Sequence, residues 1–481
     1  MERDDKGIGA AKLGDFPEWY AQVVQKAELA DYGPVKGTIA FRPYSYGIWE
    51  LIQNAFDNMI KKTGHKNAYF PILIPESFIK KESEHFEGFA PEVFWVTHSG
   101  NNPLSERLIL RPTSETIIYY FMAKWIRSWR DMPLLLNQWC NVTRAEIKDT
   151  KPFIRTSEFL WQEGHTAHAT HEEAEKEVMQ ILEFYRKIIE EYIAVPVIIG
   201  KKSEREKFAG AEYTMTLEAM MPDGKALQCG TSHNLGQNFS KPFEVKFLDK
   251  DEKNKFAYTT SWGISTRLLG ALIMVHGDDK GLVLPPRVAP IQAIIVPIAY
   301  DGESGKEVLS NADAIAAELN RKGIRTEIDK REGYTPGWKF NYWEMKGVPI
   351  RIEIGPKDIA NKRAVIVKRV SGEKNPVERD KLLNQVKKDL NSIQKEMFKK
   401  ASALLKERTT DVNNYEEFKD MLSSKGGFIK VKWCGSGECE EQIKKETTAT
   451  CRAIIDQKEV SGKCVVCNMD AKYLAYFAKA Y

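Results

Sequence analysis

The segment from residue 143 to residue 165 constrains the fold of this chain more than any other. It reads TRAEIKDTKPFIRTSEFLWQEGH. Arg144 and Glu146 are two residues apart, so on a strand they would share one face. The polar segment 148–152 contains a proline and predicts a turn, and residues 153–161 would resume as a second strand. The sequence therefore predicts a β-hairpin.

The predicted hairpin would hold two guanidinium groups over one cavity. Arg144 comes from its first half and Arg155 from its second, and the ring of Phe159 would lie between these arginines and Trp161. A guanidinium fork binds phosphate oxygens in pairs, and an aromatic face suits a nucleobase. This combination favours a nucleoside triphosphate as the ligand.

A third arginine follows a predicted helix start. Ser265 and Thr266 precede Arg267, and the apolar run after it has helical character. Helix N-termini attract anions. A triphosphate held by the three arginines would need Mg²⁺ to offset its remaining charge, and Glu146 and Gln228 would position that metal or the adenine. The alternative is that the arginines are surface ion-pair partners.

These segments resemble the motifs of class II aminoacyl-tRNA synthetases. The hairpin resembles motif 2, residues 263–267 resemble motif 3, and HKNAYFPILIP at residues 65–75 resembles motif 1. Within the class, three further segments are similar to prolyl-tRNA synthetases of the archaeal and eukaryotic type: LRPTSET at 110–116, FLWQEGH at 159–165 and QCGTSH at 228–233. The resemblance spans essentially the whole chain. Motif 1 implies a homodimer.

The resemblance implies a proline–tRNA ligase. Such an enzyme activates L-proline with ATP to prolyl-adenylate and transfers it to the 3′ end of tRNA(Pro), with Arg144 and Arg267 as catalytic residues. It carries the amino-acid role onto Thr113, Glu115, Arg144, Trp161, Glu163 and His233. It carries the ATP role onto Arg144, Glu146, Arg155, Thr156, Phe159, Gln228, Thr231, Ser265 and Arg267.

The chemistry of proline agrees with this set. Proline is compact and apolar and carries a secondary ammonium, for which Glu115 supplies the anion and Thr113 a neutral acceptor. Trp161 would cover one face of the ring, and Phe208 would close the other side. Core packing is the alternative for these two aromatic residues.

A chain of 481 residues predicts about three domains. Residues 1–284 would form an α+β catalytic domain with an antiparallel sheet and flanking helices. Residues 285–405 would form an anticodon-binding α/β domain with largely parallel strands and a long exit helix. Residues 406–481 would form a small α/β zinc-binding domain. The expected helices of the first domain cover residues 17–29, 42–62 and 170–192.

The charge distribution of residues 361–410 suits a nucleic-acid partner and a solvated helix face equally well. The net charge is only +4, but residues 361–410 hold 14 lysines and arginines against 6 aspartates and glutamates. That surplus would grip a phosphate backbone, although a solvated helix face is the alternative. Glu344, Arg351 and Lys357 match anticodon positions of the family and suit guanine edges; a strand-edge ion-pair network is the other interpretation.

Five of the seven cysteines lie in the last 70 or so residues. Cys434, Cys439, Cys464 and Cys467 form two pairs that suit a closed tetrahedral Zn²⁺ site, with Gly435 and Gly437 allowing the first pair to bend. A site that uses Cys451 and a set of plain buried thiols are the alternatives.

Two other groups of histidine and cysteine residues are weaker candidates for a metal site or a catalytic pair. His165, His168 and His171 have a spacing that can bind metal, but they would not share one helical face. Cys229 and His233 read as pocket wall rather than as a nucleophile and its base.

Further expectations concern location and the chain's end. There is no apolar run near the ~18 residues of a membrane span, and the charged residues 2–6 do not begin a signal peptide. We therefore expect a cytoplasmic protein whose partners include neither a membrane nor DNA. Tyr473, Tyr476, Phe477 and Tyr481 would lie on one side of a helix, and in similar proteins the terminal carboxylate reaches toward the active site.

The segment between motifs 2 and 3 is too short to hold an editing domain, so alanine activation without hydrolytic correction is expected. Two other functions remain open: a synthetase for another small amino acid such as threonine, and a non-catalytic tRNA-binding protein with a synthetase fold.

Overall fold

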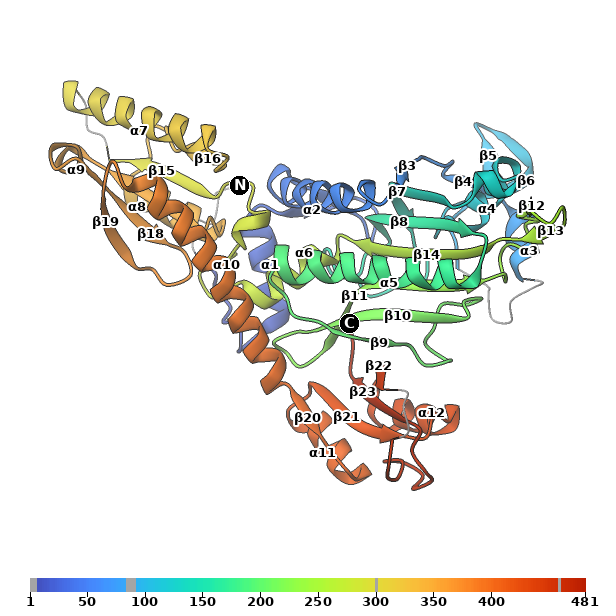
Figure 1. Ribbon diagram of the computed structural model, residues 1–481. Helices are drawn as coiled ribbons and strands as arrows, with labels where there is room; N and C mark the ends of the chain where they lie inside the picture. The colour runs from blue at the N-terminus through green and yellow to red at the C-terminus, as the bar shows by residue number, and fades with distance from the viewer. Residues whose placement is uncertain (1–6, 84–91, 299–301, 457–459) are drawn as a thin grey trace.

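The computed structural model describes residues 7–83, 92–298, 302–456 and 460–481. The charged residues 2–6, on which the signal-peptide expectation rests, lie outside this set. Within it, no helix combines the length with the apolar character needed to cross a bilayer. The chain forms a broad body with two smaller lobes joined by a long helix (Figure 1).

The body is built on an antiparallel sheet, as the sequence predicts. In the described residues the strands follow the order β20-β21-β23-β22-β9-β10-β11-β14-β8-β7-β3, and neighbours from β9 to β7 are antiparallel. The strands of the body are β3 (Lys66–Asn67), β7 (Leu134–Thr143), β8 (Glu158–His168), β9 (Ile198–Lys201), β10 (Tyr213–Met220), β11 (Ala226–Gly236) and β14 (Tyr258–Ser265).

The structure corrects the predicted hairpin in one respect. Strand β7 ends at Thr143 and β8 begins only at Glu158, so Arg144 and Arg155 lie in the connection between the strands. Phe153 has a positive φ of 63°, a conformation that no strand contains. The second strand therefore starts five residues later than the pattern of alternation indicates.

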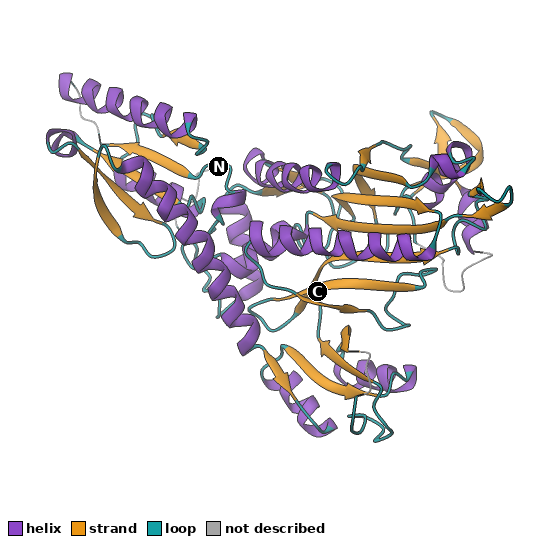
Figure 2. Cartoon of the chain, in the orientation of Figure 1, coloured by secondary structure: helices purple, strands orange, loops and turns teal. Residues whose placement is uncertain are grey.

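Helices cover one face of this sheet, and the main core lies beneath them (Figure 2). Thr170 caps α5 in a capping box with Glu173, as expected. Trp49, Tyr185 and Trp262 are almost fully buried, and burial of each apolar side chain contributes about 1.5–3 kcal/mol. The helices are α1 (Phe16–Lys26), α2 (Pro43–Lys61), α5 (His171–Lys187), which continues as the π-helix η2 (Ile188–Tyr192), and α6 (Arg267–His276).

A three-stranded sheet at the far end of the body positions the 111–115 loop. Arg111 is fully buried and donates to the carbonyl oxygens of Phe70 at 2.8 Å and Asn141 at 2.9 Å. This anchors the loop to β7 just before α4. The elements here are β4 (Leu73–Pro75), α3 (Glu76–Ser83), β5 (Trp95–Ser99), β6 (Asn102–Leu110) and α4 (Glu115–Trp125).

Short elements complete the body. They are β1 (Ala30–Tyr32), β2 (Ile39–Phe41), η1 (Trp129–Asp131), β12 (Lys246–Leu248), β13 (Asn254–Phe256) and η3 (Pro286–Val288).

The second unit is a mixed rather than largely parallel sheet. Strands β16, β15 and β17 are parallel, but β17, β18 and β19 are antiparallel. A short turn joins β18 to β19 without a crossover helix. The sequence did not predict these two strands, because residues 363–378 are rich in charged side chains. The elements are β15 (Ala293–Pro297), α7 (Glu303–Arg321), β16 (Thr326–Ile328), α8 (Pro336–Met345), β17 (Ile350–Ile354), α9 (Pro356–Ala360), β18 (Arg363–Lys368), β19 (Lys374–Glu378) and the exit helix α10 (Leu382–Glu407).

The third unit extends the sheet of the body through a contact between β22 and β9. The expectation of a helix near the C-terminus is wrong, because Tyr473 to Ala478 form strand β23. Ala475 and Phe477 are fully buried, and this period of two is that of a strand. The elements are β20 (Thr409–Asp411), α11 (Tyr415–Ser424), β21 (Phe428–Trp433), α12 (Gly437–Thr447), β22 (Thr450–Asp456) and β23 (Tyr473–Ala478).

Candidate active site

A cavity of about 400 Å³ opens on the sheet of the body. Its walls come from β8, β10, β11 and β14, from the starts of α4 and α6, and from the loops that contain residues 113–114, 144–156 and 202–208. Every residue predicted for the amino acid and for ATP lines this one cavity: Thr113, Glu115, Arg144, Glu146, Arg155, Thr156, Phe159, Trp161, Glu163, Phe208, Gln228, Thr231, His233, Ser265 and Arg267.

The cavity brings the three arginines together. The backbone of Arg144 is fixed by a 2.7 Å hydrogen bond from its N–H to the carbonyl of Ser157. Arg155 is exposed in the connection between β7 and β8. Arg267 is the first residue of α6 and donates to the carbonyls of Ile154 at 3.2 Å and Gln228 at 3.3 Å.

Two of these guanidinium groups are poorly solvated. Burial lowers the pKa of Arg144, against the opposing effect of Glu146, Glu115 and Glu163 acting through space. Burial likewise lowers the pKa of Arg267, against the opposing effect of Cys229 and Glu218, and the charges of Arg452 and Arg144 add to the lowering. Cations that are held close together with limited solvation attract an anion strongly. This wall of the cavity suits phosphate oxygens.

A carboxylate lies elsewhere in the cavity, at the start of α4. Glu115 is 5% exposed, and the hydroxyl of Thr113 donates to its Oε2 at 2.5 Å. The cavity therefore offers a buried carboxylate for a cationic group as well as cations for phosphate.

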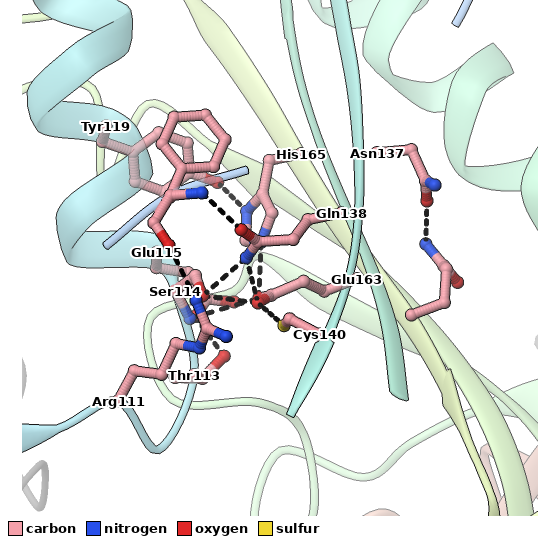
Figure 3. A network of polar contacts seen from close by, with 12 residues as sticks. Arg111, Thr113, Ser114, Glu115, Tyr119, Asn137, Gln138, Cys140, Glu163 and His165 are labelled. Carbon is pink, nitrogen blue, oxygen red and sulfur yellow. Dashed lines mark hydrogen bonds and ion pairs between the residues drawn. The ribbon is translucent and has the colours of Figure 1, made fainter. Parts of the chain in front are cut away.

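Glu163 is the centre of a buried hydrogen-bond network (Figure 3). Its carboxylate accepts from the hydroxyl and N–H of Ser114, from Gln138 at 3.0 Å, from His165 at 3.0 Å and from the thiol of Cys140 at 3.4 Å. Although burial raises the pKa of Glu163, the hydrogen bond and charge of His165 hold it below the usual value. With its oxygens occupied in this way, Glu163 acts on the cavity by fixing Ser114 and His165.

A chain of hydrogen bonds orders the wall near His233. The N–H of Phe208 donates to the hydroxyl of Thr214 at 3.0 Å, and that hydroxyl lies 2.8 Å from Nδ1 of His233. Burial and the charge of His165 lower the pKa of His233 to about 3, so its imidazole is neutral. The hydroxyl of Thr214 thus links the backbone of the 202–208 loop to the imidazole of His233. The rings of Phe208 and His233 pack with centroids 4.8 Å apart.

The nucleophile alternative for Cys229 finds no geometric support. Its thiol donates to the carbonyl of Leu227 at 3.5 Å, and burial raises its pKa to about 12. Cys229 and His233 both line the cavity, as wall residues.

The sequence missed several lining residues, among them Lys202, Glu206, Thr214 and Ser261. They belong to no recognisable motif, and only the fold brings them to the cavity.

The four predicted cysteines converge in the third unit. The sulfur atoms of Cys434, Cys439, Cys464 and Cys467 lie within 4.8 Å of one another, with 3.7 Å from Cys434 to each of Cys439 and Cys467. Tetrahedral thiolates at ~2.3 Å from zinc are ~3.8 Å apart, so the donor set fits zinc. Gly435 has a φ of 86° and supplies the predicted bend. Gly437 instead begins α12.

The other metal candidates do not assemble. Cys451 is buried in β22 and outside the cluster. In the part of the chain that the structure describes, the three histidines form no metal cluster either. His165 contacts Glu163, His168 contacts Thr166, and His171 contacts Glu212.

A second cavity of about 200 Å³ lies in the second unit. Glu344 and Arg351 both line it, and so do three cations of the basic stretch. Lys357 does not line it, and is exposed on α9. Glu344 pairs with Lys280 at 3.0 Å, and Arg351 pairs with Glu353 at 2.8 Å. The cations of the basic stretch are Lys368, Arg369 and Lys374.

Tyr481 lies beside the connection between β7 and β8 that contains Arg144 and Arg155. The hydroxyl of Tyr481 donates to Asp223 at 2.6 Å, and its N–H donates to the carbonyl of Ala226 at 3.1 Å. The ammonium of Lys151 is 4.9 Å from the centroid of its ring. A role for its carboxylate stays a prediction.

Known proteins match this chain along nearly all its length. Residues 94–276 match the tRNA synthetase class II core domain (G, H, P, S and T), residues 292–389 the anticodon binding domain, and residues 415–481 the prolyl-tRNA synthetase C-terminal domain. A proline–tRNA ligase of Cenarchaeum symbiosum is 55% identical over 99% of both chains. One of Alkaliphilus oremlandii is 54% identical over 97% of this chain and 96% of its own. The chain therefore belongs to the prolyl-tRNA synthetase family of class II aminoacyl-tRNA synthetases.

Proposed function

We propose that this chain is a proline–tRNA ligase and that the 400 Å³ cavity is where prolyl-adenylate forms. One observation carries the proposal: three arginines and a buried carboxylate, which come from three separate segments of the sequence, line the same cavity. The arginines suit a triphosphate, and Glu115 suits the ammonium of an amino acid.

In the first step, a carboxylate oxygen of proline attacks the α-phosphorus of ATP. The bond from that phosphorus to the bridging oxygen breaks, and pyrophosphate leaves with the bonding electrons. Arg144 would bridge the proline carboxylate and the α-phosphate, where negative charge builds up in the transition state. Arg155 and Arg267 would hold the other phosphates. Positioning and charge stabilisation supply the catalysis, and no covalent enzyme intermediate is needed.

The amino acid would lie against Glu115 and Thr113. Its secondary ammonium would donate to the carboxylate of Glu115, and Trp161 and Phe208 would cover the two sides of its ring. His233 would present a neutral imidazole, which adds no positive charge to compete with the ammonium.

The nucleotide would occupy the arginine side of the cavity. Its adenine would stack on Phe159. The remaining polar positions for ATP would be Glu146, Thr156, Gln228, Thr231 and Ser265.

In the second step, a ribose hydroxyl at the 3′ end of tRNA(Pro) attacks the carbonyl carbon of the adenylate, and AMP leaves. The second unit would bind the anticodon, with Glu344 and Arg351 facing guanine edges. Lys357 would contribute from the neighbouring helix α9.

Two metal ions belong to this proposal. Mg²⁺ offsets charge on the triphosphate, and Glu146 and Gln228 are the candidates to position it. Zn²⁺ would be held by the four-cysteine cluster in a closed site with a structural role.

We also propose a homodimer. The support is a set of exposed apolar side chains near motif 1 and the three-stranded sheet, with exposed fractions from 36% to 69%; exposed apolar patches mark association sites. These residues are Tyr69, Leu73, Trp95, Tyr120 and Trp125.

The proposal also assigns a function to each domain and a location to the protein. Catalysis would belong to residues 1–284, anticodon binding to residues 285–405 and zinc binding to residues 406–481. A cytoplasmic location accords with a role in protein synthesis.

The test is amino-acid-dependent exchange of pyrophosphate into ATP, measured across a panel of amino acids. The proposal requires proline to give the highest kcat/KM. Preference for threonine would mean that the synthetase acts on a different amino acid. Exchange with none of the amino acids, while the chain still binds tRNA, would support the non-catalytic alternative.

A further inference from the structure

The third unit contacts a wall of the cavity at a short segment, residues 202–208, which we call the wall segment. Lys202, Glu206 and Phe208 of this segment line the cavity. Its far end is tied to the body by the hydrogen bond from Phe208 to Thr214. Its near end follows β9, which adjoins β22 of the third unit.

A buried carboxylate joins the near end to the third unit. Glu218 of β10 is fully buried. Its Oε1 accepts from the ammonium of Lys202 at 2.8 Å, and its Oε2 accepts from Nε and Nη2 of Arg452 at 3.0 and 2.8 Å. Arg452 belongs to β22 and is 7% exposed. A cation of the cavity wall and a cation of the third unit thus share one carboxylate.

A second buried contact involves the next residue of the wall segment. The hydroxyl of Ser203 donates to Oε1 of Glu440 at 2.7 Å, and the two residues are 1% and 3% exposed. Glu440 belongs to α12. Arg205 of the wall segment contacts the same helix, because its guanidinium donates to the carbonyl of Gly437 at 3.1 Å.

The backbones meet equally closely at this junction. A Cβ atom on Gly200 would lie 2.6 Å from the carbonyl oxygen of Ile454, a distance that real Cβ atoms do not adopt. Only glycine allows β9 to approach β22 in this way. The junction is therefore closely packed, and the third unit has little freedom to move independently of the wall segment.

We propose that Glu440 and Arg452 are positioning residues for the amino-acid end of the cavity, so that the third unit completes the proline site from outside. They act on the ligand only through Lys202, Ser203 and the wall segment that ends at Phe208. The inference rests on the proposed placement of proline beside Phe208. Glu218 and Arg452 influence Arg267 through space, but the hydrogen bonds that hold the arginines assigned to ATP go elsewhere, from Arg144 to Ser157 and from Arg267 to Ile154 and Gln228. Proline binding should therefore respond to these residues more than ATP binding does.

The test compares Glu440→Ala with Glu440→Gln in the full chain. Alanine removes the acceptor for Ser203, whereas glutamine keeps one. We expect Glu440→Ala to raise the KM for proline in pyrophosphate exchange about tenfold, the effect of losing one charge-assisted hydrogen bond. The kcat and the KM for ATP should change less than about twofold, and Glu440→Gln should restore the KM for proline. Zinc content is measured in each variant, because Cys439 is adjacent.

Deuterium uptake by the wall segment gives a readout that is independent of activity. Glu440→Ala should speed uptake across residues 203–208, and Glu440→Gln should not. Arg452→Met should act in the same direction as Glu440→Ala, and Arg452→Lys should reverse part of its effect. Lys463→Met is the matched control, since it breaks an exposed ion pair with Asp470 within the same unit.

The inference is overturned if Glu440→Ala leaves both the KM for proline and the uptake of the wall segment unchanged. It is also overturned if the KM values for proline and ATP rise together. If Arg452→Met does not fold, Ser203→Ala takes its place and must show the same selective effect. Absence of proline-dependent exchange in the unmodified chain would instead contradict the proposed function, and the uptake comparison would still decide the inference.

Discussion

Replacing Arg144 by alanine should lower kcat/KM for proline activation by about a thousandfold. A guanidinium and a phosphate oxygen ~4 Å apart interact by about 4 kcal/mol at the effective dielectric constant of a protein surface. Each 1.36 kcal/mol is worth about a factor of ten in rate. The variant would also leave Glu115, Glu146 and Glu163 without the cation that they now influence, which adds repulsion toward an incoming carboxylate and triphosphate.

The assay is proline-dependent pyrophosphate exchange at saturating ATP. Arg144→Lys keeps the charge but loses the two-pronged geometry, so its loss should be smaller, on the order of tenfold. Arg287→Ala is the control. It breaks an exposed ion pair with Glu191 at 3.0 Å, and such pairs contribute at most about 1 kcal/mol. If folded Arg144→Ala retained activity within about tenfold of the unmodified chain, the proposed charge stabilisation would be refuted.

Three further predictions concern zinc, pH and substrate choice. The purified chain should contain one zinc ion held by the four-cysteine cluster, and Cys439→Ser should lose it and lower Tm while Cys451→Ser keeps it; equal zinc loss from both variants would contradict the assignment. Burial lowers the pKa of His165, but its hydrogen bond to Glu163 and the charges of Glu115 and Glu163 raise it above the usual value. This shift adds stability that is fully present below the ordinary pKa of 6.5 and is lost as pH rises through the folded value. His165→Gln should therefore destabilise by about 3 kcal/mol in urea unfolding at about pH 6 and by less at about pH 9; a constant difference would show that the pair is not ionised. Alanine lacks two ring carbons, and each methylene is worth ~1–3 kcal/mol of discrimination. Alanine-dependent AMP formation should accordingly exceed that of a no-substrate control, and its absence would mean that the cavity excludes alanine by other means.

The candidate site could be predicted from sequence because its residues sit in short contiguous motifs. Glu115 begins helix α4, and Thr113 lies two residues before it. In the same way Arg267 begins helix α6, and Ser265 lies two residues before it. Local pattern and capping chemistry determine such positions. The order of strands in the sheet decides whether these motifs line one cavity. Only the resemblance to a known family indicated that they would.

The parts that the sequence did not predict depend on tertiary packing. The turn at Phe153 uses a positive φ, which an alternating pattern cannot reveal. The aromatic residues of β23 fit helical spacing as well as strand spacing, and burial against β21 and β22 decides between them. Lys202 and Arg452 are 250 residues apart in sequence, and only the fold shows that both bind Glu218.

The central claim is that three arginines converge on one nucleotide while Glu115 binds the amino acid. The most direct measurement is a crystal structure of the chain with a non-hydrolysable analogue of prolyl-adenylate. We predict a guanidinium nitrogen of Arg144 within ~3.2 Å of the phosphate mimic and the secondary ammonium within ~3.2 Å of the carboxylate of Glu115. An analogue bound outside the cavity, or bound in it with Arg144 turned away, would contradict the account.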